Sequence, residues 1–367
     1  MKFQHLLFSS LFLGVAVIAY SQNPQARQQP TTEQRVQNWL RQMDSDKDGS
    51  IAKEESRGLM QRNFQNIDQN QDGILDRKEL VALGNRLAQN ANRAPNRNAN
   101  QQQRGDAVPS DDAVRKQAPD GVILDLNIVY REGHERWKLD LAMPAEKSDE
   151  PRPAIVFIHG GGWRNGDKRR GAFLGLALHF ASKGYVTITT NYRLGGEKLH
   201  CIEDVKCAVR WLRAHADKYN VDPDRIGAYG NSAGAHLVTM LGISYTEKKL
   251  EGDGPWQDYS SRVQAVAASA TPTTPRLTAD VDYPAKLIQP MNYITADAPP
   301  FLLFHEISDG TVPVSNSDDF VKAMKDAGAK DITYHRWEDG TGHGVYGRNK
   351  EKTWPMTEAF FFRTLSP

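Results

Sequence analysis

The sequence predicts an α/β fold, with a mostly parallel sheet covered by helices on both faces, preceded by a small all-α domain. Strand-like apolar runs alternate with helix-like segments from about residue 119 to the C-terminus, which is typical of parallel sheets buried on both sides. A Gly-x-Ser-x-Gly turn joins one of these strands to a helix. Two acidic loops of one pattern lie nearer the N-terminus. These three observations divide the chain into a small and a large domain.

Length and composition are typical of a globular protein with two domains. The chain has 367 residues, of which 39% are hydrophobic and 25% charged. The formal net charge of +1 gives no reason to expect nucleic acid or an anionic membrane as a partner. Cys201 and Cys207 are the only cysteines in the sequence. If one helix carries both, they lie on different faces and too far apart to bridge, so we expect two packed thiols.

Residues 1–21 have the organisation of a secretory signal peptide. Lys2 precedes an apolar run over residues 6–20, and residues 19–21 form a small-x-small cleavage site. The run is short for a membrane span, so we expect none in the mature protein. The protein is therefore expected to be secreted or periplasmic.

Residues 30–88 contain two twelve-residue loops whose first residues are 24 positions apart (68 − 44 = 24). Each loop has oxygen-bearing side chains at positions 1, 3 and 5, glycine at 6, an aliphatic residue at 8 and glutamate at 12, which is the EF-hand calcium pattern. Ala52 offers no oxygen at position 9 of the first loop, so water is expected to fill that coordination position. The expected calcium ligands are Asp44, Asp46, Asp48, Ser50 and Glu55 in the first loop, and Asp68, Asn70, Asp72, Ile74, Asp76 and Glu79 in the second.

Residues 89–118 are expected to form a disordered linker. As far as residue 112 they are rich in Asn, Gln and Arg and nearly free of large apolar side chains. Such a segment buries too little apolar surface to offset the entropy that ordering removes.

Residues 119–367 are expected to form the large domain, with strands and helices in alternation. Strands are expected over residues 122–130, 137–143, 154–159, 185–191, 263–268, 301–304 and 332–337, with another that ends at the Gly-x-Ser-x-Gly turn. Helices are expected over residues 173–182, 202–219 and 315–327, directly after that turn, and from residue 353 onward. Because open parallel sheets carry their sites at the carboxyl ends of the strands, residues that follow strands are the candidates.

Ser232 is the candidate nucleophile, at the centre of the strand–turn–helix segment 225–237. A nucleophile on so sharp a turn stands clear of the backbone, and Gly230 and Gly234 suit positions where other backbone passes closely. A helix that begins near Ala233 points its N–H groups and positive end at the serine. An ordinary glycine turn is the alternative, but the flanking strand and helix favour a catalytic role.

Asp309 and His343 are the candidate acid and base. Asp309 lies in Ser-Asp-Gly-Thr-Val-Pro after the strand at 301–304, and His343 lies in Gly-Thr-Gly-His-Gly after the last strand. The order serine, aspartate, histidine fits a nucleophile–acid–base triad on such a sheet. Glu306 and Asp339 are competing acids, but a loop after the strand at 301–304 is better placed to reach a histidine at the next strand end.

Taken together, these motifs resemble the α/β-hydrolase superfamily. Within it they are similar to bacterial esterases related to hormone-sensitive lipase and to feruloyl/acetyl-xylan esterases. The resemblance covers roughly residue 122 to the C-terminus. It rests on His-Gly-Gly-Gly-Trp at 159–163, Asn-Tyr-Arg-Leu at 191–194, Gly-Asn-Ser-Ala-Gly at 230–234, and the segments around Asp309 and His343.

The resemblance implies a role for each candidate. Ser232 would be the nucleophile, Asp309 the acid and His343 the base, and the oxyanion hole would consist of the N–H groups of Gly161, Gly162 and Ala233. Glu306 departs from the group, which commonly has glycine there. No large lid precedes residue 159, which favours modest acyl groups over long lipids.

We therefore expect a serine carboxylester hydrolase that acts through an acyl-enzyme on short-chain or plant-polysaccharide acyl esters. Calcium would be structural, in the EF-hands, and catalysis would need no cofactor. A serine peptidase of the same fold is one alternative, and a calcium-binding interaction protein with a non-catalytic hydrolase fold is another. Docking of the EF-hand domain to a partner or a surface is a further role that the sequence leaves open.

Overall fold

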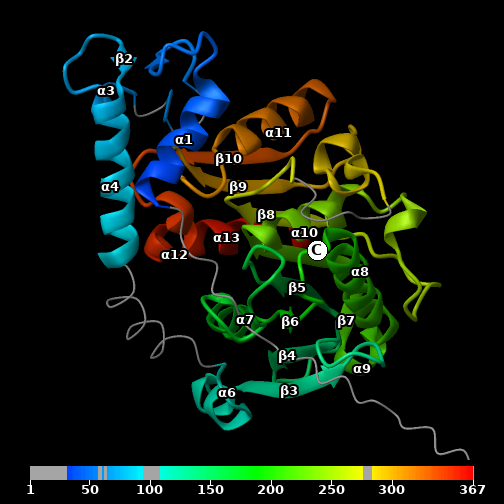
Figure 1. Cartoon of the computed structure of the whole chain (residues 1–367). Helices are drawn as coiled ribbons and strands as arrows, with labels where there is room; N and C mark the ends of the chain where they lie inside the picture. Colours follow the sequence, from blue (N-terminus) through cyan, green and yellow to red (C-terminus); the bar gives the residue numbers. More distant parts are fainter. Residues whose placement is uncertain (1–30, 57–59, 62–63, 94–107, 276–282, 367) are drawn as a thin grey trace, which may run out of the picture. The chain divides into compact units, whose positions relative to one another are not determined.

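The computed structural model describes residues 31–56, 60–61, 64–93, 108–275 and 283–366. Backbone contacts divide the chain into two units, Met1–Gly105 and Asp106–Pro367, and each is described by itself (Figure 1). The expected signal peptide, residues 1–21, lies outside the described residues, as does the segment 94–107 of the expected linker. Within the described ranges, no helix is long and apolar enough to cross a membrane.

The small unit is a pair of helix–loop–helix segments whose loops are joined by two short strands. Thr31 begins it with a capping box, in which its side chain and backbone exchange hydrogen bonds with Gln34. The strands pair antiparallel, with Ile51 opposite Leu75, the aliphatic residues at position 8 of each loop. In chain order the elements are α1 (Thr32–Met43), β1 (Ile51–Ala52), α3 (Phe64–Ile67), β2 (Ile74–Leu75) and α4 (Arg77–Arg93).

Apolar residues at helical spacing meet in the core of this unit. Val36 of α1, Phe64 and Ile67 of α3, and Leu80 of α4 are buried together. The EF-hand arrangement predicted from the sequence is therefore present, with its loops held back to back by β1 and β2.

The large unit contains one eight-stranded sheet among the described residues. The strands from β10 to β6 in spatial order pair parallel, and β4 and β3 complete the sheet as antiparallel neighbours. The sheet is therefore mostly parallel, as the sequence predicts. In spatial order the strands are β10 (Ile332–Trp337), β9 (Phe301–Glu306), β8 (Ala265–Ser269), β7 (Val221–Asn231), β5 (Arg152–Ile158), β6 (Val186–Thr190), β4 (Lys138–Pro144) and β3 (Val122–Val129).

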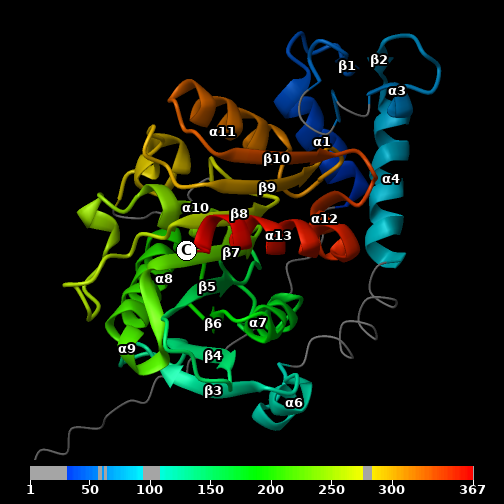
Figure 2. The same ribbon diagram turned by 180° about the vertical axis from the view of Figure 1, so that it is seen from behind.

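Helices cover both faces of this sheet (Figures 1 and 2). Val156 and Ile158 of β5 enter a core shared with α8, α9, α10 and α11, whereas Ile155 and Phe157 enter a second core with α7, α12 and α13. Alternate residues of one strand thus enter opposite cores, which explains its continuous apolar sequence. The helices are α7 (Phe173–Ser182), α8 (Lys198–Ala214), α9 (Ala216–Tyr219), α10 (Ala233–Ile243), α11 (Ser315–Asp326), α12 (Val345–Arg348) and α13 (Lys350–Leu365).

The structure corrects the limits expected for the linker at residues 89–118. At one end α4 continues to Arg93, and at the other a helix, α6 (Asp111–Gln117), belongs to the large unit. The Ser110 side chain caps α6, Val114 is fully buried, and Asp111 pairs with Arg169 at 2.7 Å. These contacts stabilise a segment whose own composition does not favour order.

Helix boundaries differ from expectation at two other places. α8 begins at Lys198, before the expected residue 202, and His215 separates it from α9 because its φ of −111° and ψ of 19° are not helical. α13 begins at Lys350, three residues before the expected residue 353. Cys201 and Cys207 both lie on α8, where they are buried free thiols, as expected.

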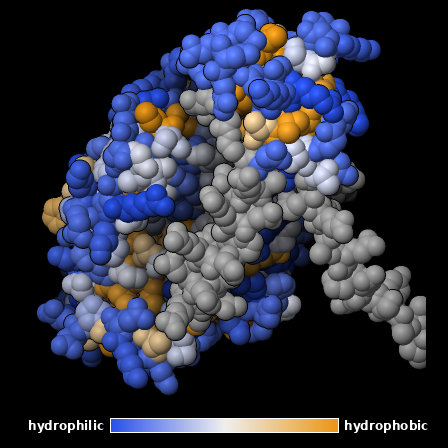
Figure 3. Space-filling model, turned by 60° about the vertical axis from the view of Figure 1, so that its left-hand side comes forward, coloured by the Kyte–Doolittle hydropathy of each residue, from blue (hydrophilic) through white to orange (hydrophobic). Residues whose placement is uncertain are grey.

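Figure 3 shows a surface on which hydrophilic residues predominate and hydrophobic residues form small separate patches. Among the described residues, exposed large apolar side chains include Ile123 and Val129 on the edge strand β3. Scattered apolar residues of this kind are ordinary on protein surfaces.

Candidate active site

Ser232 occupies the turn between β7 and α10 in a backbone conformation that residues with side chains rarely adopt. Its φ is +54° and its ψ −121°, and its amide donates to the carbonyl oxygen of Ser269 at 2.9 Å. A Cβ on Gly230 would lie 2.3 Å from the carbonyl oxygen of Gly234, and a Cβ on Gly234 would lie 2.1 Å from that of Ile158. The glycines are therefore required by close backbone approach on both sides of the serine.

His343 follows β10 and lies in the 3₁₀ turn Gly342–Gly344. Its Nε2 is 3.0 Å from Ser232 Oγ, and its Nδ1 is 2.8 Å from Asp309 Oδ2. Because a carboxylate only accepts hydrogen bonds, Nδ1 carries the proton and Nε2 accepts the hydroxyl hydrogen of the serine. The three side chains form one continuous hydrogen-bonded chain at the carboxyl end of the sheet.

Asp309 lies in the loop between β9 and α11, and its side chain is fully buried. Oδ1 accepts hydrogen bonds from the amides of Thr311 at 2.8 Å and Val312 at 2.9 Å. Burial alone would raise the pKa of Asp309, but hydrogen bonds from His305, His343 and the two amides outweigh it and hold the pKa well below its usual range. Asp309 is therefore an anion that faces the imidazole.

Glu306 and Asp339, the competing acids, do not face the imidazole of His343. Glu306 is fully buried, yet its oxygens accept hydrogen bonds from the amides of Gly340 at 3.1 Å and Gly342 at 3.0 Å. Asp339 is exposed and accepts hydrogen bonds from Thr341 in its own loop and from the side chain of Asn349. The structure thus places against the histidine the carboxylate that sequence reasoning preferred.

His305 is a further site residue, whose contacts the sequence analysis did not anticipate. It is fully buried on β9, with Nε2 3.0 Å from the carbonyl oxygen of Val312 and 3.3 Å from Asp309 Oδ2. Both neighbours are acceptors, so Nε2 carries the proton, while Nδ1 accepts from the hydroxyl of Ser317 at 2.7 Å. The sequence signal is a histidine four residues before the acid, but only the end of β9 brings the two together.

The glycine loop after β5 lies against the turn that carries the serine. A Cβ on Gly160 would lie 2.8 Å from the carbonyl oxygen of Asn231, so this close approach requires glycine. Gly161 and Gly162 have φ of +110° and +62°. The amides of Gly161, Gly162 and Ala233 donate no hydrogen bond to any residue that the structure describes. All three N–H groups are therefore available for an oxygen atom of a ligand.

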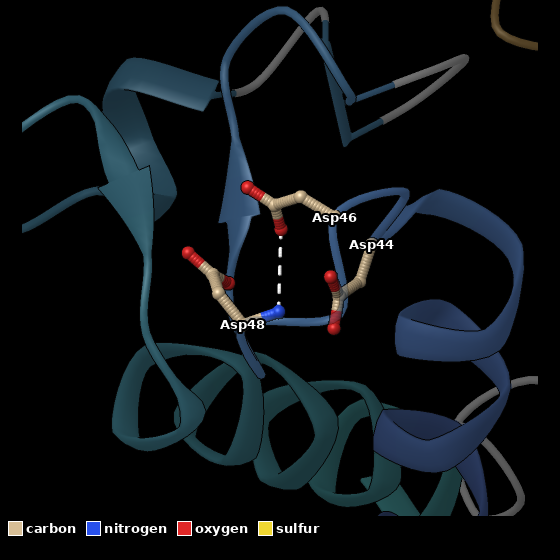
Figure 4. A group of neighbouring side chains, drawn as sticks. All are labelled: Asp44, Asp46 and Asp48. Carbon is tan, nitrogen blue, oxygen red and sulfur yellow. Dashed lines mark hydrogen bonds between the residues drawn. The ribbon is translucent and has the colours of Figure 1, made fainter.

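The first acidic loop brings three aspartates together (Figure 4). One oxygen from each of Asp44, Asp46 and Asp48 lies within 4.8 Å of the others. The Asp48 amide donates to Asp46 Oδ1 at 3.2 Å, and the Gly49 amide donates to Asp44 Oδ2 at 3.0 Å. Asp44 Oδ1 is buried and has no hydrogen-bond partner among the described residues. A cation would satisfy such an oxygen.

The second acidic loop repeats this pattern. The Gly73 amide donates to Asp68 Oδ2 at 3.0 Å, while Asp68 Oδ1 is buried and lacks a partner within the described ranges. Glu79, at position 12, accepts from the Gln69 amide at 2.7 Å and so folds back over the start of the loop. An orphaned carboxylate oxygen at position 1 of both loops, within an all-oxygen donor set, fits calcium.

Two protein families match this chain. The BD-FAE family matches residues 139–275, and the EF hand family matches residues 36–57 and 62–83. The BD-FAE range includes the glycine loop and Ser232, and the two EF hand ranges include the whole of both acidic loops.

Curated relatives of this chain include two proteins of Mycobacterium tuberculosis. The chain is 26% identical to Esterase LipC over 292 residues, which are 70% of this chain and 71% of that protein. It is 29% identical to the probable carboxylic ester hydrolase LipM over 206 residues, or 50% of this chain. The chain spans about half the length of LipM, 47%.

Solved structures with the same fold include esterase 2 of Thermogutta terrifontis. Its butyrate-bound form is 28% identical, with a TM-score of 0.58, and covers 68% of this chain and 96% of its own. Its form phosphorylated by paraoxon is 29% identical, with a TM-score of 0.59 and the same coverage. A truncated carbohydrate esterase from gut microbiota is 26% identical, with a TM-score of 0.59, and covers 68% of this chain and 99% of its own.

Proposed function

We propose that this chain, a carboxylic ester hydrolase of the α/β-hydrolase superfamily with an N-terminal EF-hand pair, acts through a triad of Ser232, His343 and Asp309. The observation that carries this proposal is the unbroken hydrogen-bonded chain from Ser232 Oγ through His343 to Asp309 Oδ2, with distances of 3.0 and 2.8 Å. It lies at the carboxyl end of a mostly parallel sheet, where this fold carries its sites, beside three amides that no described residue accepts from.

Each group has one task in the proposed reaction. Ser232 Oγ attacks the ester carbonyl carbon while His343 Nε2 takes the hydroxyl proton, which it then gives to the departing alcohol. Asp309 holds the imidazole in the required tautomer and stabilises its charged form. The carbonyl oxygen becomes an oxyanion that the amides of Gly161, Gly162 and Ala233 stabilise. Water, activated by the same histidine, then hydrolyses the acyl-enzyme.

The substrates we propose are short-chain acyl esters, with acyl groups on plant polysaccharides as the natural class. Two solved relatives support this choice: one holds butyrate, and the other is a carbohydrate esterase. The experiment is a panel of p-nitrophenyl esters from acetyl to long-chain, with a feruloyl ester, assayed with wild type and with Ser232→Ala. We expect kcat/KM to fall as the acyl chain lengthens and Ser232→Ala to be inactive. A rate that rises toward long-chain lipids would refute the substrate class, and an active Ser232→Ala would refute the mechanism.

We also propose that both acidic loops bind calcium and that the protein is exported. Calcium supplies charge compensation to the carboxylates of each loop when it is bound. One ion would be held by Asp44, Asp46, Asp48, Ser50 and Glu55, and the other by Asp68, Asn70, Asp72, Ile74, Asp76 and Glu79. Calcium is plentiful outside the cell, so affinities of roughly 10⁻⁴ to 10⁻³ M would suffice. Calorimetric titration of the full chain with calcium should show two sites, and Asp44→Asn with Asp68→Asn should abolish both.

A further inference from the structure

Glu306, the last residue of β9, is a buried carboxylate with an unusual set of partners. Its side chain is fully buried, and no ion pair among the described residues includes it. Buried carboxylates are normally paired with a cation, because removing the charge from water is unfavourable. Glu306 is satisfied by neutral donors instead. Oε2 accepts from the amide and the hydroxyl of Ser308 and from the Gly342 amide, and Oε1 accepts from the Gly340 amide.

These donors come from the two loops that carry the proposed acid and base. Ser308 directly precedes Asp309, and Gly342 directly precedes His343. The carboxylate therefore connects the loop of the acid to the loop of the base, although it contacts neither catalytic side chain. Its distance from the amide of Ser308 is 2.8 Å and from that of Gly342 is 3.0 Å, so both connections are short.

The loop of the base is shaped to present its amides to an anion. Gly340 and Gly342 have φ of +72° and +56°, the left-handed conformation that glycine adopts without strain. Thr341 between them is right-handed, with φ of −74° and ψ of −15°, and amides in such an alternating stretch form a concave anion-binding site. Burial raises the pKa of Glu306, but the hydrogen bonds from Ser308 and the two glycine amides outweigh it and lower the pKa below its usual value. The group is thus an anion at neutral pH.

We infer that the Glu306 anion is a positioning residue that holds the His343 loop in register with the Asp309 loop. This inference rests on the proposed triad. Glu306 acts on the imidazole of His343 only through the backbone of the loop. Arg348 and Asn349 also hold this loop, through Thr341 and Asp339 respectively. Loss of the Glu306 charge should therefore shift the loop rather than unfold it. Catalysis is sensitive to such shifts, because a misplacement of about 1 Å lowers the rate by roughly 100-fold.

The test compares Glu306→Gln with Glu338→Gln. Glu338 is an exposed carboxylate near the same loop, so its substitution removes the same charge without touching the connection. In Glu306→Gln, an NH₂ group faces at least one backbone N–H donor. We expect kcat for p-nitrophenyl acetate to fall roughly 10- to 100-fold with KM within about threefold. The far-downfield proton resonance of the His343–Asp309 hydrogen bond should shift or broaden in Glu306→Gln. It should be unchanged in Glu338→Gln.

Each outcome decides between this inference and its rivals. A wild-type kcat and an unchanged resonance in Glu306→Gln, with only a lower melting temperature, would reduce Glu306 to a structural residue and overturn the inference. If Glu306→Gln lost nearly all activity and Asp309→Asn kept it, Glu306 rather than Asp309 would be the acid, and the proposed triad itself would be wrong. If Glu306→Gln does not fold, Glu306→Asp replaces it. That variant keeps the charge on a shorter arm, so we expect kcat at least about threefold below wild type, and a wild-type kcat would overturn the inference.

Discussion

At the scale of single residues, the direction of each hydrogen bond assigns the proton on each imidazole of the site. Two histidines direct their protonated nitrogens at Asp309 Oδ2, His343 at 2.8 Å and His305 at 3.3 Å. The second histidine and two amides stabilise the carboxylate as an anion without reaching the serine. The charge of Asp309 is thus the feature on which the tautomer of His343 depends.

Asp309→Asn should lower kcat by about 10³- to 10⁴-fold, because an amide NH₂ group opposite Nδ1 favours the wrong tautomer of His343. Asp339→Asn is the matched control, since this exposed carboxylate is in the same loop as the histidine but does not face it. We expect the control to stay within about fivefold of wild type. Steady-state kinetics on p-nitrophenyl acetate measure both variants. A control as impaired as Asp309→Asn would contradict the assignment of the acid.

His236, on α10 one turn after Ser232, makes the stability of the folded state depend on pH. It is fully buried, with Nε2 2.7 Å from the carbonyl oxygen of Ile288 and Nδ1 accepting from Trp163 Nε1 at 3.3 Å. Burial lowers the pKa of His236 to about 4. A second proton would place two donors, Nδ1–H and the indole N–H, against each other.

The free energy of unfolding should therefore fall on acidification. The unfolded histidine takes up a proton near pH 6.5 and the folded one only near 4, so the stabilisation is complete above about pH 6.5 and disappears as pH falls through about 4. At pH 5 the contribution of His236 should be about 2 kcal/mol smaller than at pH 8. Urea unfolding of wild type and His236→Gln at both pH values tests this. Equal pH dependence in the two proteins would show that His236 does not titrate as described.

At the scale of elements, backbone clearance shapes the strand–turn–helix unit that carries the serine. Gly234 on α10 lies under the end of β5, where a Cβ would be 2.1 Å from the carbonyl oxygen of Ile158. The atoms nearest to such a Cβ are all backbone atoms of Ile158 and His159, so no flexible side chain could move to relieve the clash. The packing of helix against strand, rather than the propensity of either, is therefore what requires glycine.

Gly234→Ala should destabilise the protein by about 3 kcal/mol or prevent soluble expression, because the clash is with backbone. Gly347→Ala is the matched control, since a Cβ there meets nothing within 4 Å and its φ is not in the left-handed region. That variant should be as stable as wild type, or more stable by about 0.5 kcal/mol. Thermal unfolding compares the two. Similar melting temperatures would contradict the packing described for the turn.

The pattern of apolar residues predicts the elements that pack against the two cores of the large unit. The expected ranges 173–182 and 332–337 coincide with α7 and β10, because the apolar residues of these segments face the cores. α6 could not be predicted in this way. It has seven residues and one fully buried side chain, Val114, and it is stabilised by Arg169, far along the chain. Segments that depend on distant partners carry little local signal.

The candidate site likewise has residues that the sequence alone identifies and residues whose roles depend on distant contacts. Ser232, Asp309 and His343 each follow a strand, and motifs mark them in the sequence, so they could be named from residues alone. The roles of His305 and Glu306 depend on the end of β9, where His305 contacts the loop of Asp309 and Glu306 also contacts the loop of His343. No spacing in the sequence reports that arrangement.

At the scale of the whole molecule, the chain combines two units that differ in the size of their apolar cores and in the buried charges they contain. The large unit has two apolar cores and holds the side chains of the proposed triad. The small unit has a core of a few apolar residues and leaves buried carboxylate oxygens at Asp44 and Asp68 without partners among the described residues. If calcium binds there as proposed, its binding free energy adds to the stability of this unit.

Removal of calcium should therefore affect the small unit and leave catalysis unchanged. With calcium at about 100 times its dissociation constant, binding stabilises a site by about 2.7 kcal/mol. EGTA should lower the melting transition of residues 31–93, while kcat on a small soluble ester stays within about twofold. Asp44→Asn with Asp68→Asn, which lacks both sites, is the control and should not respond to EGTA. A large fall in kcat that calcium restores would show instead that calcium regulates the esterase.

The most direct measurement of the central claim is the site of covalent labelling by paraoxon. Esterase 2 of Thermogutta terrifontis, a relative of this chain, has been solved phosphorylated by this compound. A serine reacts in this way only when a neighbouring base activates it. Peptide mapping by mass spectrometry should locate one diethylphosphoryl group per chain on Ser232, with loss of ester hydrolysis in proportion to labelling. Labelling should be lost in His343→Ala. Ester hydrolysis that continues while Ser232 is fully labelled, or a label on another residue, would contradict the account.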